Sequence, residues 1–241
     1  MQNQLPQKIK AGIETNENTK TDMEYKVTKD LELRERVRRV KEMLRLSMDG
    51  ITAQRLRNLG YKLVFGVTYP RLKELSAKIE PDAELAMNLW NLHQRETMIL
   101  ATIIMHPIDE SVIPFLIKDT FNEEIAEYLS RNLLTRLSNP WSIIESTYEG
   151  EYFDYIRYSL ASRLLLSGSD SESVTSLIAE SPTKTQQLNE RQISSIASLL
   201  KRAYPTHKLQ VKSALETIIL QPDAKSKWLT EEVKTYIEFT S

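Results

Sequence analysis

The chain has 241 residues, with 32 Lys and Arg against 33 Asp and Glu, for a formal net charge of −1 at pH 7. This balance excludes a surface that is basic throughout, so any nucleic-acid site must come from local clusters of Lys and Arg. The absence of cysteine excludes disulfides and thiolate metal sites and fits a reducing compartment. No apolar stretch approaches the roughly 18 residues of a membrane span, and the N-terminal residues lack an apolar leader. We therefore expect a cytoplasmic protein.

Residues 1–27 are polar and rich in Gln, Asn, Thr and Lys, which predicts a disordered or loosely attached arm. Beyond them, apolar residues recur at helical spacing in segments separated by short turns that contain Pro, Gly, Asn or Ser. These segments predict helices over 29–48, 52–59, 69–79, 81–90, 95–105, 111–118, 122–137, 140–147, 152–166, 171–179, 187–203, 207–220 and 230–239.

This order of short helices and turns indicates the fold class. Alternating apolar and polar residues, the pattern of strands, are nearly absent, and only six residues are Gly. Stacked helical hairpins bury their apolar faces against their neighbours, as helical repeats do. We therefore expect an all-α helical-repeat superhelix, an α-α solenoid, in which residues 28–241 form a single domain.

The usual signatures of catalytic and cofactor sites do not occur. The three histidines, His93, His106 and His207, are far apart, and none has a second His or a carboxylate four residues on along a shared helix face. No G-x-G-x-x-G, phosphate-binding loop or G-x-S-x-G is present. We expect neither a metal nor a cofactor.

Residues 61–107 contain the most informative sequence motifs. A Gly-Val-Thr-x-Pro-Arg-Leu run (Gly66 to Leu72), a Leu89-Trp90 pair and an Arg-Glu-x-x-Ile-Leu-Ala run (Arg95 to Ala101) resemble the bacterial DNA alkylation repair family. Its members are alkylpurine DNA glycosylases built from helical hairpins of the HEAT kind. The resemblance extends over about residues 55–220. It implies a HEAT-like superhelix whose concave face follows a DNA backbone.

In active members of this family, a central helix carries a Trp-x-x-x-Asp motif. A 3- or 7-alkylated purine already carries a positive charge, so its departure needs little help from a general acid. Catalysis needs instead a carboxylate that stabilises the oxocarbenium-like sugar, and a positioned water. Aligning residues 121–134 with that helix puts Glu123 at the Trp position and Glu127 at the Asp position. The resemblance thus implies Glu127 as the catalytic carboxylate and a basic residue, near Arg157, on the lesion strand.

Several positions depart from the family pattern. Glu123 replaces the aromatic wall, Met98 stands where relatives carry Arg, and no aromatic occurs at residues 212–217. Trp141, at the start of the next helix, is the nearest substitute aromatic. These departures predict that glycosylase activity is weak or lost, although Glu127 with another aromatic could still support slow excision. Glu127 could instead form an ordinary i,i+4 ion pair with Arg131, and Trp141 could simply pack in the core.

Two basic clusters are candidates for contacts with DNA phosphates. The first comprises Arg34, Arg36, Arg38, Arg39, Lys41, Arg45, Arg55, Arg57 and Lys62, and the second Lys201, Arg202, His207, Lys208 and Lys212. Either cluster could equally be a solvated helix face. We name as the candidate DNA-binding residues Arg131, Arg157, Lys201, Arg202, Lys208 and Lys212.

These observations leave two functions open. The first is a monomeric, weakly binding partner of duplex or branched DNA, with no membrane contact. The second is a protein-interaction scaffold, because helical solenoids also present concave surfaces to proteins. A continuous basic stripe through Arg131, Arg157, Lys208 and Lys212 would favour DNA, and a mixed or acidic surface would favour a protein partner.

Overall fold

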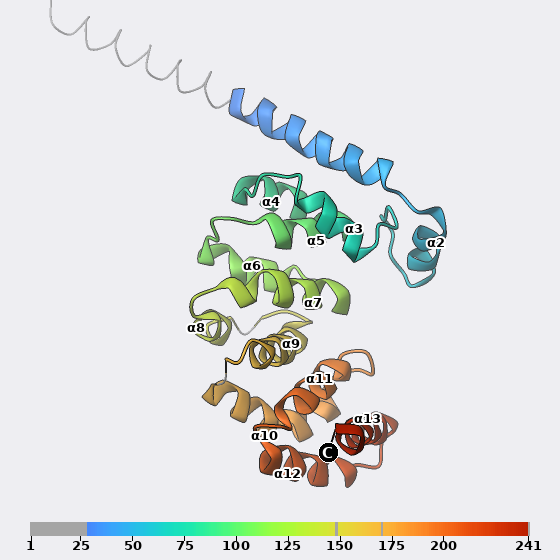
Figure 1. The fold of residues 1–241 in the computed structure, drawn as a ribbon, viewed down its shortest axis with the longest axis vertical. Coiled ribbons are helices and arrows are strands. Elements are labelled where there is room, and N and C mark those ends of the chain that lie inside the picture. Colours follow the sequence, from blue (N-terminus) through green and yellow to red (C-terminus); the bar gives the residue numbers. More distant parts are fainter. Residues whose placement is uncertain (1–27, 148, 170, 241) are drawn as a thin grey trace, which may run out of the picture.

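The computed structural model describes residues 28–147, 149–169 and 171–240. Every regular element in these ranges is a helix and none is a strand, which confirms the all-α prediction (Figure 1). The arm predicted for residues 1–27 lies outside the described residues.

A long helix covers residues 28–46. The helices that follow are α2 (Gly50–Asn58), α3 (Tyr69–Ser76), α4 (Ala83–Trp90), α5 (Arg95–Ile104), η1 (Glu110–Val112), α6 (Ile113–Lys118), α7 (Glu123–Asn132), η2 (Leu134–Arg136), α8 (Pro140–Glu145), α9 (Phe153–Leu166), α10 (Glu172–Gln187), α11 (Ile193–Ala203), α12 (Lys208–Ile219) and α13 (Ala224–Thr240).

The helices stack in two rows. One row runs without a break from α3 through α5, α7, α9 and α11 to α13, each helix packing on the next. In Figure 1, α6, α8 and α10 lie to the left of this row, and α2 stands on the opposite side of the stack, beside α3. The arrangement is the expected superhelix of helical hairpins, and the row from α3 to α13 places side chains from distant parts of the sequence along one face.

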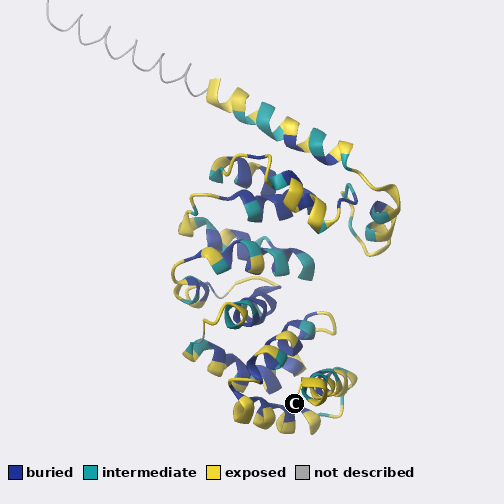
Figure 2. Cartoon of the chain, in the orientation of Figure 1, coloured by how far each residue is buried: buried dark blue, intermediate teal, exposed yellow. Residues whose placement is uncertain are grey.

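The buried apolar residues form two clusters along this stack. One extends from Val40 to Leu160, and the other from Tyr158 to Val233. Trp141 is partly buried and packs against both clusters. In Figure 2, buried residues fill the contacts between the rows, while yellow, exposed residues follow the outer surfaces of the first and last helices.

Side-chain caps explain why several helices begin where the sequence predicts. The Asp82 carboxylate accepts a hydrogen bond from the Leu85 amide at 2.7 Å, and the Asn122 side chain accepts one from Ile125 at 2.9 Å. Such caps satisfy amides in the first turn that have no partner within the helix. The starts predicted at 81–82 and 122 are therefore confirmed to within two residues.

Three predicted boundaries in the C-terminal part are wrong. Helix α10 continues to Gln187 instead of ending at residue 179, α11 begins only at Ile193, and α13 begins six residues early, at Ala224. The error in α10 comes from Pro182, which lies inside the helix although proline cannot donate to the carbonyl four residues before it. The Ser181 hydroxyl donates to that carbonyl, Ile178 O, at 2.7 Å and so replaces the missing bond.

The segment before α3 is held by a buried carboxylate. Glu96, whose side chain is fully buried, accepts hydrogen bonds from three successive amides, those of Phe65, Gly66 and Val67. The Arg95 guanidinium lies 3.2 Å from Glu96 Oε1 and donates to Val67 O at 2.9 Å. The Gly-Val run and the Arg-Glu pair, which carry the resemblance in sequence, therefore bind each other in the fold.

Gly66 donates its amide to this clamp, and its position also requires a glycine. Its φ of +77° lies in the left-handed region, and a Cβ there would come within 2.3 Å of Asp49 O. The backbone approaches the start of α2 too closely for any side chain.

Candidate nucleic-acid interface

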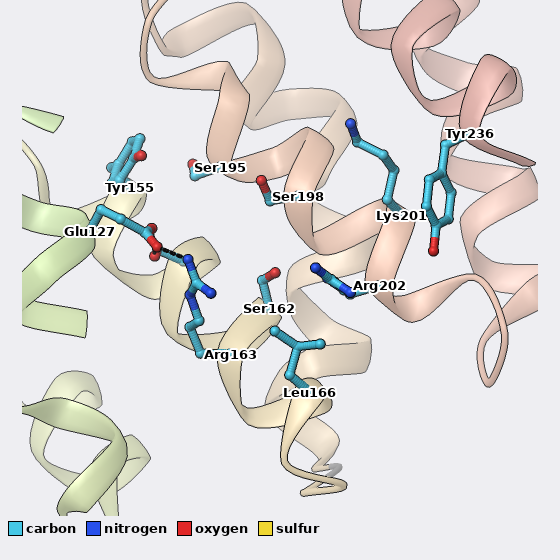
Figure 3. Close-up of a pocket in the computed structure, with 11 residues that line it drawn as sticks. Glu127, Tyr155, Ser162, Arg163, Leu166, Ser195, Ser198, Lys201, Arg202 and Tyr236 are labelled. Carbon is cyan, nitrogen blue, oxygen red and sulfur yellow. Dashed lines mark hydrogen bonds and ion pairs between the residues drawn. The ribbon is translucent and has the colours of Figure 1, made fainter. Parts of the chain in front are cut away.

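A cavity of about 420 Å³ lies on the face formed by α7, α9, α11 and α13. Each of these helices contributes at least one polar side chain, and those of α9 and α11 recur at helical spacing (Figure 3). The lining residues are Glu127, Tyr155, Ser159, Ser162, Arg163, Leu166, Ser195, Ser198, Lys201, Arg202 and Tyr236.

One side of the cavity is formed by a carboxylate and its two partners. Glu127, on α7, accepts hydrogen bonds from the Ser159 hydroxyl and the Arg163 guanidinium of α9. The Glu127 and Arg163 side chains keep 26% and 31% of their surface exposed, so this ion pair borders solvent. Burial and the nearby Glu127 carboxylate raise the pKa of Tyr155 to about 12, so its hydroxyl stays protonated at neutral pH.

The opposite side of the cavity is cationic. Lys201 Nζ lies 2.5 Å from Glu232 Oε1, and Arg202, on the next residue of α11, is exposed. In Figure 3 the Arg202 guanidinium lies near Ser162, with Lys201 and Tyr236 beyond it. Hydroxyls and cations on facing helices form a surface that suits an anion with several acceptor oxygens.

Next to the cavity, two aromatic rings and an arginine form a stack on the same row of helices. Tyr69 of α3 and Tyr128 of α7 stack with ring centroids 4.4 Å apart, and the Arg131 guanidinium lies 5.0 Å from the Tyr69 centroid. The Tyr69 hydroxyl donates to Asn132 Oδ1 at 2.8 Å. Arg131 lies one helical turn after Glu127 on α7, so the stack is on the same side of that helix as the Glu127 wall of the cavity.

The structure places the residues proposed from sequence in different parts of the molecule. Glu127, Lys201 and Arg202 line the same cavity from opposite sides, and Arg131 lies one turn after Glu127 on α7. Glu127 pairs with Arg163, and not with Arg131 as expected for an i,i+4 pair, because Arg131 turns towards the Tyr69 ring.

Arg157 lies apart from this group, with its guanidinium 3.2 Å from Asp154 and 3.3 Å from Glu180. Lys208 lies over the Tyr204 ring, and Lys212 lines a different groove, between α12 and α13. A continuous stripe through Arg131, Arg157, Lys208 and Lys212 is therefore not formed.

The structure also places Trp141 and Glu123, the two positions at which the sequence left the aromatic wall open. Trp141 packs between the two apolar clusters and does not line the cavity. Glu123, at the family's Trp position, lines a separate cavity with Tyr152 and Arg191. The aromatic rings at the edge of the Glu127 cavity are instead those of Tyr155 and Tyr236.

Arg163, Tyr236 and the four serines of the cavity were not predicted from the sequence. A signal was present in α9, where Ser159, Ser162, Arg163 and Leu166 occupy positions i, i+3, i+4 and i+7 and so share one face. Ser195, Ser198 and Arg202 repeat this spacing on α11. Polar residues that recur at helical spacing share one face of a helix. Where the other faces of that helix are buried, this polar face indicates a surface that is open to solvent or to a ligand.

Within residues 28–147, 149–169 and 171–240, no group of three His, Asp or Glu side chains is placed to hold a metal ion. In the same ranges, none of the helices combines the length and the apolar character that crossing a bilayer requires.

No protein-family model and no curated protein matches the sequence. A solved structure superimposes on 82% of this chain and 94% of its own chain, with a TM-score of 0.66 and 18% sequence identity. It is described as a new family of proteins related to the HEAT-like repeat DNA glycosylases with affinity for branched DNA structures. The chain described here therefore has the fold of a HEAT-like helical repeat, as the sequence predicted.

Proposed function

We propose that this protein is a DNA-binding HEAT-like repeat module that holds a DNA backbone across the cavity between α7, α9, α11 and α13. The observation that carries the proposal is the convergence of Arg163, Lys201 and Arg202 with serine hydroxyls on one concave surface. Guanidinium, ammonium and hydroxyl donors are the groups that proteins use most for phosphate contacts. The affinity of the similar structure's family for branched DNA supports DNA as the anion.

The proposed affinity is modest and depends steeply on salt. Arg131, Arg163, Lys201 and Arg202 supply the cations of this surface, while Glu127 and Glu232 neutralise two of them. Each phosphate that a cation neutralises contributes about 0.9 to the slope of log K against log salt on duplex DNA. Few contacts therefore give a complex that forms at low salt and dissociates as the salt rises.

We propose further that the chain shares descent with the DNA alkylation repair glycosylases but has little or no glycosylase activity. The clamp made by Gly66, Val67, Arg95 and Glu96 supports the descent. Glu127 supports the loss of activity, because its carboxylate already accepts from Ser159 and Arg163 and no tryptophan lines its cavity. A carboxylate neutralised in this way stabilises a developing sugar cation poorly.

The binding proposal is tested by titrating labelled duplex and branched DNA at ~50 mM and ~200 mM salt. We expect the wild-type protein to bind at the lower salt, and Lys201→Glu/Arg202→Glu to bind at least about tenfold more weakly. The matched control is Lys78→Glu/Lys227→Glu, which changes two exposed lysines outside the cavity by the same total charge. Failure of wild type to bind either DNA would reject the proposal and favour a protein-interaction scaffold.

The catalytic part is tested by following release of 7-methylguanine from methylated duplex DNA. We expect no release, or very slow release that Glu127→Gln leaves unchanged. Rapid release by wild type that is lost in Glu127→Gln would show that Glu127 is catalytic after all.

A further inference from the structure

The most basic part of the described chain lies outside the cavity, in the first helices. Residues 28–62 contain ten Lys and Arg against five Asp and Glu, whereas residues 63–241 contain more acidic than basic residues. The net charge of −1 is therefore the sum of a basic N-terminal part and an acidic remainder. An extended anion would be attracted first to the basic part.

Four of these cations line one side of a single helix. Arg34, Arg38, Lys41 and Arg45, at successive steps of four, three and four residues, border a hollow of about 590 Å³ with Phe65 at its edge. We call these four residues the N-terminal basic face. Eleven residues of helix extend about 16 Å, and this length matches about five nucleotides of a DNA strand at about 3.4 Å each.

Much of this positive charge is available to a ligand. The side chains of Arg34 and Lys41 make no hydrogen bond or ion pair in the part of the chain that the structure describes, and both residues are exposed. Arg38 and Arg39 share the Glu35 carboxylate, and Arg45 pairs with Glu42, in exposed pairs. Exposed pairs of this kind contribute little to stability, so a phosphate can replace the carboxylate at little cost.

A series of contacts joins the N-terminal basic face to the cavity. The backbone amide of Phe65, at its edge, donates to Glu96, and Tyr69, four residues later, stacks on Tyr128. Arg131, whose guanidinium lies 5.0 Å from the Tyr69 centroid, is one helical turn after Glu127 on α7. Figure 1 shows the helix of residues 28–46 at one end of the stack, beyond α3, α4 and α5 and well apart from α9 and α11. The two basic surfaces are thus separate parts of one stack of helices.

We infer that the N-terminal basic face is a second phosphate-binding surface, which holds another arm of a branched DNA while the cavity holds the first. This inference rests on the proposed function. Two separated sites on one body bind a ligand that reaches both much more tightly than a ligand that reaches one. A branched DNA has two backbones diverging from one point, and a linear duplex offers only one direction.

The test compares Arg34→Glu/Lys41→Glu with the Lys78→Glu/Lys227→Glu control, on a four-way junction and on a linear duplex with the sequence of one arm. We expect the first variant to lose about tenfold or more in affinity for the junction. The slope of log K against log salt should fall by about two, since two phosphate contacts are removed. Linear duplex binding should change by less than about threefold. Both altered residues are exposed, so thermal unfolding should be unchanged.

The outcomes separate this inference from the proposal on which it rests. If Lys201→Glu/Arg202→Glu weakens binding but Arg34→Glu/Lys41→Glu behaves like the control, the cavity proposal stands and the second surface is rejected. If Arg34→Glu/Lys41→Glu weakens junction and duplex equally, the face contacts DNA but not a second arm, and the inference is rejected. If wild type binds neither DNA, both are rejected.

Discussion

Two glutamates of this protein, Glu96 and Glu127, are each paired with an arginine, in very different surroundings. Glu96 is fully buried and accepts from three backbone amides as well as from Arg95. Glu127 lies at the wall of an open cavity, where Ser159 and Arg163 are its partners and solvent reaches both members of the ion pair. The same residue types thus form a structural clamp in one region and an accessible polar surface in the other.

The difference shows what burial does to an ion pair. Removing one member of a buried pair leaves an uncompensated charge, which costs several kcal/mol, whereas a solvent-bordered pair contributes little to folding. The partly exposed pair can therefore exchange partners when an anion arrives, and the buried pair cannot.

Glu96→Ala should lower the free energy of unfolding by about 3–5 kcal/mol, because it leaves the amides of residues 65–67 without their acceptor. Arg95 loses one partner but keeps Val67 O and the Glu124 carboxylate. Glu127→Ala, the matched change at the cavity, should lower it by about 1 kcal/mol or less. Urea unfolding followed by circular dichroism measures both. Equal losses in the two variants would break the contrast between clamp and cavity.

Arg163→Gln should reduce DNA affinity by about tenfold and leave the fold intact. The change removes one cation that contacts a DNA phosphate. It also leaves the Glu127 carboxylate without its ion-pair partner, where its negative charge repels the DNA backbone. Fluorescence anisotropy with labelled DNA measures the affinity, and Arg157→Gln serves as control because Arg157 lies outside the cavity between Asp154 and Glu180. A larger loss with Arg157→Gln would place the DNA elsewhere.

Glu127→Gln should strengthen DNA binding by several-fold, because it removes a negative charge that both repels phosphate and occupies Arg163. The same anisotropy titration detects the change, and Glu145→Gln, at an exposed glutamate outside the cavity, is the control. Weaker binding in Glu127→Gln would mean that the carboxylate contacts the DNA favourably.

Lys208→Glu/Lys212→Glu should give the smallest effect on DNA binding, a loss of about twofold, with folding intact. Both residues belong to α12 and neither lines the cavity, so they act on DNA only through the long-range field, which salt screens within about 10 Å at 0.1 M. A loss as large as that of Arg163→Gln would show that the bound backbone extends to α12.

The sequence predicted the helical hairpins well, because caps such as Asp82 and Asn122 and the helical spacing of apolar residues act locally. It failed at Pro182, where a serine hydroxyl replaces a backbone bond, since no rule of spacing reveals that compensation. The candidate site was predicted only in part. Glu127, Lys201 and Arg202 were named, but Arg163 was not, because its partner is 36 residues away on a helix whose orientation tertiary packing determines.

The resemblance to a repair family illustrates the same limit. The residues that carry it, Gly66, Val67, Arg95 and Glu96, form the buried clamp and thus report the fold. The residues that would report chemistry lie in a cavity built from four helices, and local sequence says little about which of their side chains meet. The fold and the chemistry therefore depend on different residues. Only the residues that determine the fold occur in short continuous motifs that can be recognised in the sequence.

The most direct test of the central claim, that DNA lies in the cavity, uses the absence of cysteine from the chain. Ser198→Cys places a unique thiol at the cavity, and Thr175→Cys places one on the exposed surface of α10. We predict that saturating branched DNA slows maleimide labelling of Ser198→Cys at least about tenfold and leaves Thr175→Cys unchanged. Undiminished labelling of Ser198→Cys in a protein that still binds the DNA would contradict the account.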